Sequence, residues 1–204
     1  MIVRAGINVT SIQPQRRYTI YTVDTNVNKY IVAALHLEDR RNYKTAERIH
    51  TIQTIVPDIE KNELCNDSDN TIVIGDFNAN PYDEEMLSKF GFNAVLFKSL
   101  IINEEYTNPN SNRIRRFYNP ILHYLSEETE MYGSFYTEQN YMTSYWHCLD
   151  QVLVRRKLAN NIAGLQYLKS INNIDLIKGK RPNNDISDHL PLLVNIIEGA
   201  YDER

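Results

Sequence analysis

The chain has 204 residues, which is long enough for one domain with a substantial hydrophobic core. Its formal net charge of −4 excludes nucleic-acid binding through a general positive field, so phosphate contacts would need local basic patches. No apolar stretch approaches the length of a membrane span, and the first residues show no secretory leader. Cys65 and Cys148 have no metal-ligand spacing. We therefore expect a cytoplasmic protein with reduced thiols and no membrane association.

The first third of the sequence predicts two strands and a helix. Residues 16–25 alternate between apolar and polar positions, residues 28–39 contain an apolar run, and the polar tip between them indicates a hairpin. A core-facing helical stripe follows, with apolar residues at three- and four-residue steps: Tyr43, Ala46, Ile49, Ile52, Val56 and Ile59. Pro57 lies within this pattern and predicts a kink or an early end of the helix.

The rest of the chain mixes short helices and strands. Helices are expected in "YDEEMLSKFGF", which Gly91 would close, and in "NPILHYL". Strands are expected in "TIVIG", "GSFYTE" and "CLDQVLVRR", and "ISDHLPLLVNI" should add a last strand of the buried type. The segment 103–116 is polar and too long for a simple connection. Elements in this order predict a layered α/β or α+β domain.

A carboxylate and an amide follow the buried strand at 71–75. Asp76 and Asn78 are two residues apart, so they share one face if the chain stays extended. Gly, Asp, Asn and Pro also favour turns, and this stretch alone fits a turn equally well. The catalytic interpretation therefore depends on companions elsewhere in the chain.

Three further strands carry polar residues at one end. His36 ends the apolar run of residues 28–39, and Asp150 stands at the start of "DQVLV". Asp188 and His189 directly precede the last apolar run. A single histidine or an Asp-His pair is common by chance, but four such clusters on four strands indicate a shared site at the strand ends.

These motifs resemble the endonuclease/exonuclease/phosphatase superfamily, the relatives of deoxyribonuclease I and exonuclease III. The motifs "GDFN", "LDQVL" and "SDHLPL", with an upstream "HL", match in order and approximate spacing from about residue 17 to 197. The resemblance implies a layered α/β sandwich of the deoxyribonuclease I-like type. It also implies a metal-dependent phosphodiesterase with nucleic acid as its substrate. Residues 1–204 would then form a single domain that spans two-thirds to three-quarters of the family fold.

The resemblance also implies a role for each polar residue. His189 resembles the general base or transition-state stabiliser, and Asp150 resembles the carboxylate that fixes its tautomer. Asp76 resembles the residue that positions the attacking water or the leaving group. Asn78 would donate to a non-bridging phosphate oxygen, where charge builds in the transition state. His36 would be a second imidazole in contact with the phosphate.

The implied metal is Mg²⁺, with Mn²⁺ as the alternative, and Asp188 would sit on or near it. In the superfamily the principal metal ligand is a Glu at the end of an early strand, and that strand has no counterpart in this sequence. Glu38 is the nearest spare carboxylate. The resemblance thus implies a chain without the amino-terminal strands, which would bind Mg²⁺ weakly and self-associate through an uncovered sheet edge.

Arg113, Arg115 and Arg116 are candidates for substrate binding, because arginines interleaved with aromatic residues suit phosphate pairing and base stacking. A solvated charged loop fits this stretch equally well. Two rival functions also stay open. One is a phosphatase or phospholipase that acts on inositol phosphates or sphingomyelin. The other is a catalytically impaired binding module that keeps the fold and lacks the metal-ligand Glu.

Overall fold

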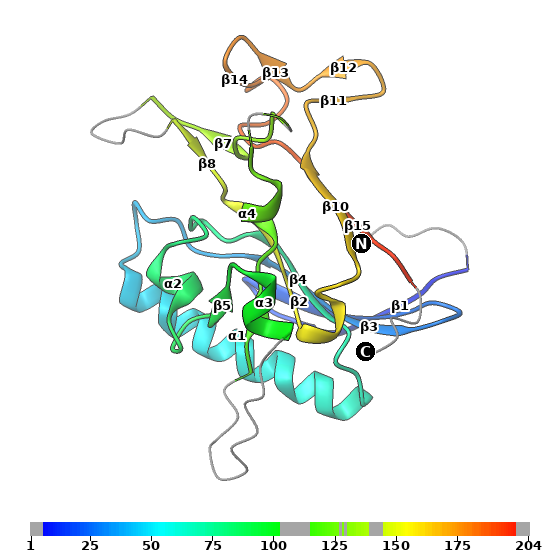
Figure 1. Cartoon of the computed structure of the whole chain (residues 1–204). Helices are drawn as coiled ribbons and strands as arrows, with labels where there is room; N and C mark the ends of the chain where they lie inside the picture. Colours follow the sequence, from blue (N-terminus) through cyan, green and yellow to red (C-terminus); the bar gives the residue numbers. More distant parts are fainter. Residues whose placement is uncertain (1–5, 103–114, 127, 129, 139–144, 199–204) are drawn as a thin grey trace.

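The computed structural model describes residues 6–102, 115–126, 128, 130–138 and 145–198. Its centre is a seven-stranded mixed sheet with the order β1-β2-β3-β4-β9-β6-β5 (Figure 1). The bounds of these strands are β1 Asn8–Pro14, β2 Tyr18–Asp24, β3 Lys29–His36, β4 Thr71–Asp76, β9 Asp150–Val154, β6 Phe117–Tyr118 and β5 Ala94–Val95. The predicted α/β class is confirmed.

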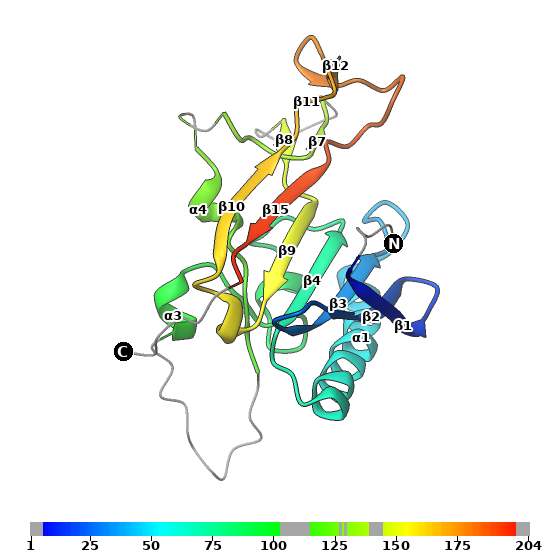
Figure 2. The same ribbon diagram turned by 90° about the vertical axis from the view of Figure 1, so that its right-hand side faces the viewer.

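Helices and smaller strand pairs surround this sheet. The helices are α1 Thr45–Asn66, α2 Glu84–Leu87, α3 Lys98–Ile102 and α4 Ile121–Tyr124, with a 3₁₀ turn at Arg156–Leu158. The antiparallel pairs are β10 Ile162–Tyr167 with β15 Leu192–Ile196, β7 Phe135–Tyr136 with β8 Trp146–His147, β11 Ser170–Ile171 with β12 Ile174–Asp175, and β13 Ile177–Lys178 with β14 Arg181–Pro182. The β7–β8 and β11–β12 hairpins both lie beyond one end of the central sheet, and β7 contacts β14 (Figures 1 and 2).

Side chains of the central strands alternate between two hydrophobic clusters. Ile31, Ala33 and Val73 pack with the buried residues of α1 on one face. Ile72 and Ile74 pack with β10 and β15 on the other face. The sheet is therefore covered by α1 on one side and by the β10–β15 pair on the other (Figure 2). Burial on both faces explains the continuous apolar runs in β3 and β4.

The last strand differs from its prediction as a buried strand. Along β15, half-buried positions alternate with exposed ones, and Leu193 is 38% exposed. Within the described ranges β15 pairs only with β10. One face of β15 packs on the sheet and the other meets solvent, although its sequence is almost wholly apolar. The expected self-association through an uncovered edge stays a prediction.

Helix α1 continues through Pro57, so an early end of the helix at that residue is wrong. The helix runs for 22 residues and ends only at Asn66. A proline ring opposes the carbonyl of the residue four positions earlier, which is Gln53 here. Pro57 and Gln53 are both exposed, so water can satisfy the freed carbonyl while the opposite side of the helix packs on the sheet.

Gly75, at the end of β4, is required by the close approach of β3. Its φ is +147°, and a Cβ at this position would lie 2.0 Å from the carbonyl oxygen of Leu35. We expect Gly75→Ala to lower the free energy of unfolding by at least about 1–3 kcal/mol, because backbone strain and a backbone clash act together. Urea unfolding followed by circular dichroism measures this change.

Gly164→Ala is the matched control for that substitution. A Cβ at Gly164 would meet only the side-chain amide of Asn195, at 3.3 Å, and that group can shift. We expect a small change in stability for this control. Equal losses for Gly75→Ala and Gly164→Ala would contradict the role assigned to Gly75.

Among the described residues, no helix combines the length and the apolar character needed to cross a bilayer. Cys65 is exposed, Cys148 is buried, and both are free thiols, as the sequence predicts. Burial raises the pKa of the Cys148 thiol to about 11.

Candidate active site

The register of the central sheet brings three of the predicted site residues side by side. His36 is the last residue of β3 and pairs in register with Asp76, the last residue of β4. Asp76 in turn pairs with Asp150, the first residue of β9. Strands β3 and β4 are parallel, and β9 is antiparallel to them. The three side chains therefore meet at one end of the sheet, although they are far apart in sequence.

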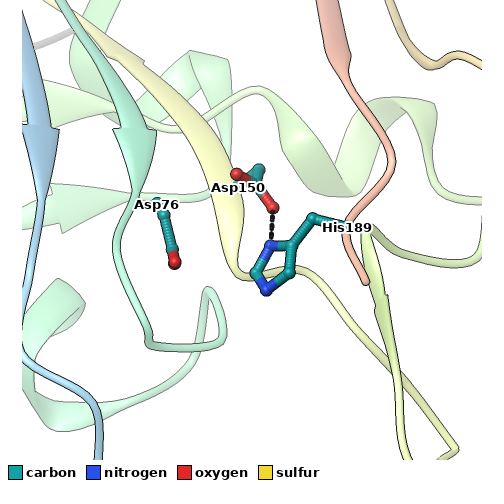
Figure 3. A group of neighbouring side chains, drawn as sticks. All are labelled: Asp76, Asp150 and His189. Atoms are coloured by element: carbon teal, nitrogen blue, oxygen red, sulfur yellow. Dashed lines mark hydrogen bonds and ion pairs between the residues drawn. The ribbon is translucent and has the colours of Figure 1, made fainter. Parts of the chain in front are cut away.

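His189 joins this row from the segment before β15 (Figure 3). Its Nδ1 lies 2.6 Å from Oδ2 of Asp150, which is the contact expected from the sequence. The backbone N–H of His189 donates to Oγ of Ser187 at 3.0 Å, and a β-bridge ties His189 to Phe135. An ionised carboxylate can only accept, so Nδ1 carries the proton in the neutral imidazole. This tautomer leaves Nε2 with a free lone pair.

The charges around the site shift two pKa values upward. Burial alone would lower the pKa of His189, but the hydrogen bond and charge of Asp150 raise it above its ordinary value. The charges of Asp76 and Asp188 act in the same direction. Burial and then the charge of Asp150 raise the pKa of Asp76, against a hydrogen bond from the backbone of Asn78. The site therefore concentrates negative charge, which favours a cation or a protonated imidazole.

Asn78 orients Asp76 and has no free amide hydrogen for a phosphate. Its backbone N–H donates to Oδ1 of Asp76 at 2.8 Å, and its side-chain Nδ2 donates to Oδ2 at 3.2 Å. The same Nδ2 also donates to the carbonyl oxygen of Leu37 at 2.9 Å. Both amide hydrogens are thus engaged. The geometry favours an orienting role for Asn78 over the implied phosphate donor.

His36 lies at the rim of the site. Its Nε2 is 3.5 Å from Oδ2 of Asp76, and its side chain is 71% exposed. This position leaves the imidazole open to a ligand that enters from solvent. On the other side of the row, a hollow of about 190 Å³ is lined by Asp150, His189, Leu176 and Ile186, among others.

Asp76, Asp150 and His189 form a possible metal site. One potential ligand atom from each lies within 4.8 Å of the others. Two carboxylates suit a hard divalent cation such as Mg²⁺, which takes one or two protein carboxylates and keeps several waters. Asp188 is exposed and lies outside this group. Glu38 also lies outside it, because it is buried against Arg17, at 3.2 Å.

Arg115 lies away from the site and does not match its predicted role in substrate binding. Its guanidinium forms ion pairs with Glu63 and Asp69. Glu63 also accepts a hydrogen bond from Thr71 at 2.6 Å, and Thr71 begins β4, whereas Asp76 ends it. Six residues of strand separate the two ends by roughly 17–20 Å. Arg115 therefore stabilises the opposite end of the sheet.

The backbone of Arg116 lies at the same end of the sheet as Arg115. The backbone carbonyl of Arg116 accepts from Nη1 of the buried Arg155, at 3.2 Å, next to the Glu63 cluster. Arg113 lies outside the described residues. The basic patch predicted from this stretch is therefore not part of the candidate site as described.

Arg48 of α1 supports the loop after β4, and sequence reasoning missed it. Its side chain is fully buried, and Nη2 donates to the carbonyl oxygens of Phe77 and Asn78, both at 2.9 Å. Nη1 pairs at 2.7 Å with Glu85, which is also buried. Asn78 has a φ of +48°, which few residues other than glycine adopt. Arg48 thus holds a strained backbone next to Asp76.

No family model and no curated protein matches the sequence. Among solved structures, the chain is similar to the 3′ phosphatase NExo from Neisseria bound to a product DNA hairpin (11% identity, TM-score 0.46, 96% of this chain and 72% of that one). It is also similar to the endonuclease domain of TRAS1, a telomere-specific non-LTR retrotransposon (12%, 0.49, 93% and 67%). A third is TDP2 from D. rerio with a single-strand DNA product (14%, 0.49, 94% and 67%).

With identities of 11–14% and TM-scores below 0.5, these similarities assign no family and no function to this chain.

Proposed function

We propose that this chain is a metal-dependent phosphodiesterase that hydrolyses nucleic-acid phosphodiester bonds. The observation that carries the proposal is the Asp150–His189 pair, joined at 2.6 Å and placed beside the carboxylate of Asp76. A histidine oriented by a carboxylate, with its second nitrogen free, is the arrangement that general base catalysis requires.

The site residues would act as follows. Nε2 of neutral His189 takes a proton from a water molecule, whose oxygen forms a bond to phosphorus. The phosphorus–oxygen bond to the leaving group breaks in line, and the leaving oxygen then takes up a proton. Asp150 keeps the imidazole in the required tautomer and stabilises the imidazolium that forms. Asp76, held by Asn78, orients the attacking water.

The donor set supports a divalent cation. Asp76 and Asp150 would hold the cation through carboxylate oxygens, which lie close to one another at the end of the sheet. A bound cation would neutralise charge on the phosphate oxygens as the transition state forms. His36, at the rim, would contact the phosphate from the solvent side.

A substrate panel tests the proposal. We expect single- or double-stranded DNA or RNA to be cleaved in the presence of Mg²⁺ or Mn²⁺ and to stay intact in EDTA. An oligonucleotide with a 3′-phosphate, inositol phosphates and sphingomyelin vesicles complete the panel. If only sphingomyelin or inositol phosphates are cleaved, the substrate is a small phosphoester or a lipid and not a nucleic acid. If no substrate reacts, while DNA binds and the fold is intact, the chain is a binding module.

The raised pKa of His189 gives a test that needs no substrate. In the metal-free protein, we expect the imidazole to titrate above its ordinary value of 6.5, because its pairing with Asp150 outweighs its burial. In Asp150→Asn the pairing charge is lost and the burial stays, so the pKa should fall below that of the unmodified chain. Proton–carbon NMR of the histidine ring, assigned through His189→Gln, measures both values. An unchanged pKa in Asp150→Asn would contradict the pairing.

A further inference from the structure

A second cleft, of about 360 Å³, adjoins the candidate site. It lies between the β7–β8 hairpin, the end of β10 and the β13–β14 hairpin. Leu190 lines this cleft and also the hollow around His189. Tyr167 lines it as well, and the Tyr167 hydroxyl donates to the carbonyl oxygen of Asp150 at 2.7 Å. A group bound in this cleft would therefore lie next to the Asp150–His189 pair, separated from it by the side chains of Leu190 and Tyr167.

Aromatic rings line the cleft. The ring centroids of Tyr132 and Trp146 are 6.5 Å apart, with an interplanar angle of 42°. Tyr132 is 48% exposed, although its ring is large and apolar. Met131, Ile177 and Leu190 add apolar surface. A lining of aromatic rings and apolar side chains suits a flat partner, because rings stack through their faces.

The charges of the cleft compensate one another. Nζ of Lys169 pairs with Glu130 at 2.7 Å and lies 5.6 Å from the ring centroid of Tyr132. Lys180 adds a second positive charge to the lining, and Asp175 adds a second negative charge. A second phosphate would need a surplus of positive charge, which these four residues do not supply. They do offer hydrogen-bond donors and acceptors to the edge of a neutral ring.

We propose that this cleft binds a nucleobase of the substrate strand next to the scissile phosphate. The inference deepens the proposed function and rests on it for the position of that phosphate. The volume lies at the small end of ligand pockets, which run from roughly 300 to 1,000 Å³, so it suits one base better than a longer segment. Stacking on Tyr132 and Trp146 would supply most of the affinity.

The test uses Trp146, which is the only tryptophan of the chain and therefore the only source of tryptophan fluorescence. The titration is done in EDTA, where no turnover is expected. We expect added nucleosides to quench the Trp146 fluorescence up to a plateau, as binding to one site requires. Tyr132→Ala should weaken nucleoside binding at least about five-fold. Phe97→Ala, which removes a still more exposed ring just after the edge strand β5, should leave nucleoside binding unchanged.

A second arm links the cleft to catalysis. Tyr132→Ala should raise the KM for an oligonucleotide and leave kcat nearly unchanged. An abasic residue beside the cleaved bond should remove the difference between Tyr132→Ala and the unmodified chain. Quenching by inorganic phosphate but not by nucleosides would overturn the proposal, as would quenching that Tyr132→Ala does not alter. Nucleoside binding without any cleavage would support the cleft and count against the proposed function alone.

Discussion

Replacing His189 by alanine is expected to lower the kcat of phosphodiester cleavage by about 10²- to 10⁴-fold, the usual contribution of a general base. The imidazole of His189 is oriented by a carboxylate through the 2.6 Å contact with Asp150, whereas His36 lies 3.5 Å from Asp76 and is largely exposed. Its side chain is 22% exposed and packs mainly against Phe135, so the free energy of unfolding should change little. Steady-state kinetics and urea unfolding of the same preparation separate the two effects.

His50→Ala is the matched control, because His50 is exposed on α1, away from the site. It should leave kcat and stability unchanged. Asp150→Asn should also lower kcat by a large factor, since the tautomer of the imidazole is no longer fixed and the proposed cation site loses a carboxylate. Near-normal turnover in His189→Ala would end the assignment of His189 as the base.

Replacing Arg48 by methionine is expected to destabilise the fold by about 3–5 kcal/mol, which is the range for breaking a buried ion pair. The change leaves Glu85 buried with one partner fewer, since only the half-exposed Arg40 still contacts it, at 3.1 Å. It also removes both hydrogen bonds to the carbonyl oxygens of Phe77 and Asn78. Urea unfolding measures the loss of stability.

A double variant separates stability from positioning. Arg48→Met with Glu85→Leu removes both buried charges, and we expect it to recover much of the lost stability. It should not recover kcat, because the loop that carries Asn78 still lacks its donors. A double variant with full kcat would show that Arg48 only stabilises the fold. Lys61→Met, which removes an exposed cation from the same helix, serves as the control.

The ends of the central strands could be predicted from sequence, because their residues combine two independent signals. Continuous apolar runs mark β3, β4 and β9 as buried, and a polar residue of catalytic type stands at one end of each. These polar residues lie side by side because β3, β4 and β9 are adjacent strands, and the hydrophobic pattern of the strands sets their register. His189 was found in the same way, although its contact with Phe135 comes from a hairpin that was predicted only in part.

Helix α1 shows where sequence reasoning fails. Its buried stripe runs through Arg48, Ile52, Ile55 and Ile59 and ends at polar residues, whereas the pattern assigned Tyr43 and Ala46 to the core. A buried arginine is stable only with partners, and those of Arg48 lie about 30 residues or more along the chain. Local periodicity carries no information about such partners, so it cannot identify Arg48 as a buried residue.

Arg115 was assigned to the substrate for the same reason. A cluster of arginines in a polar stretch looks alike whether it meets a phosphate or a carboxylate. Its partner Glu63 lies 52 residues earlier in the chain, on α1. Strands β1 and β10 are not predicted from the sequence, and each forms by pairing with a neighbouring strand.

The residues proposed to act on the phosphate and the hairpins proposed to contact the base belong to different sheets. Asp76 and Asp150 belong to the seven-stranded sheet, whereas β11–β12 and β13–β14 are independent two-stranded units that share no ladder with it. Changes in the length or sequence of these two hairpins would reshape the neighbouring cleft without shifting the register of the catalytic row. Homologous chains could therefore diversify in what they bind while conserving how they react, and hairpin exchange offers a direct route to altered specificity by engineering.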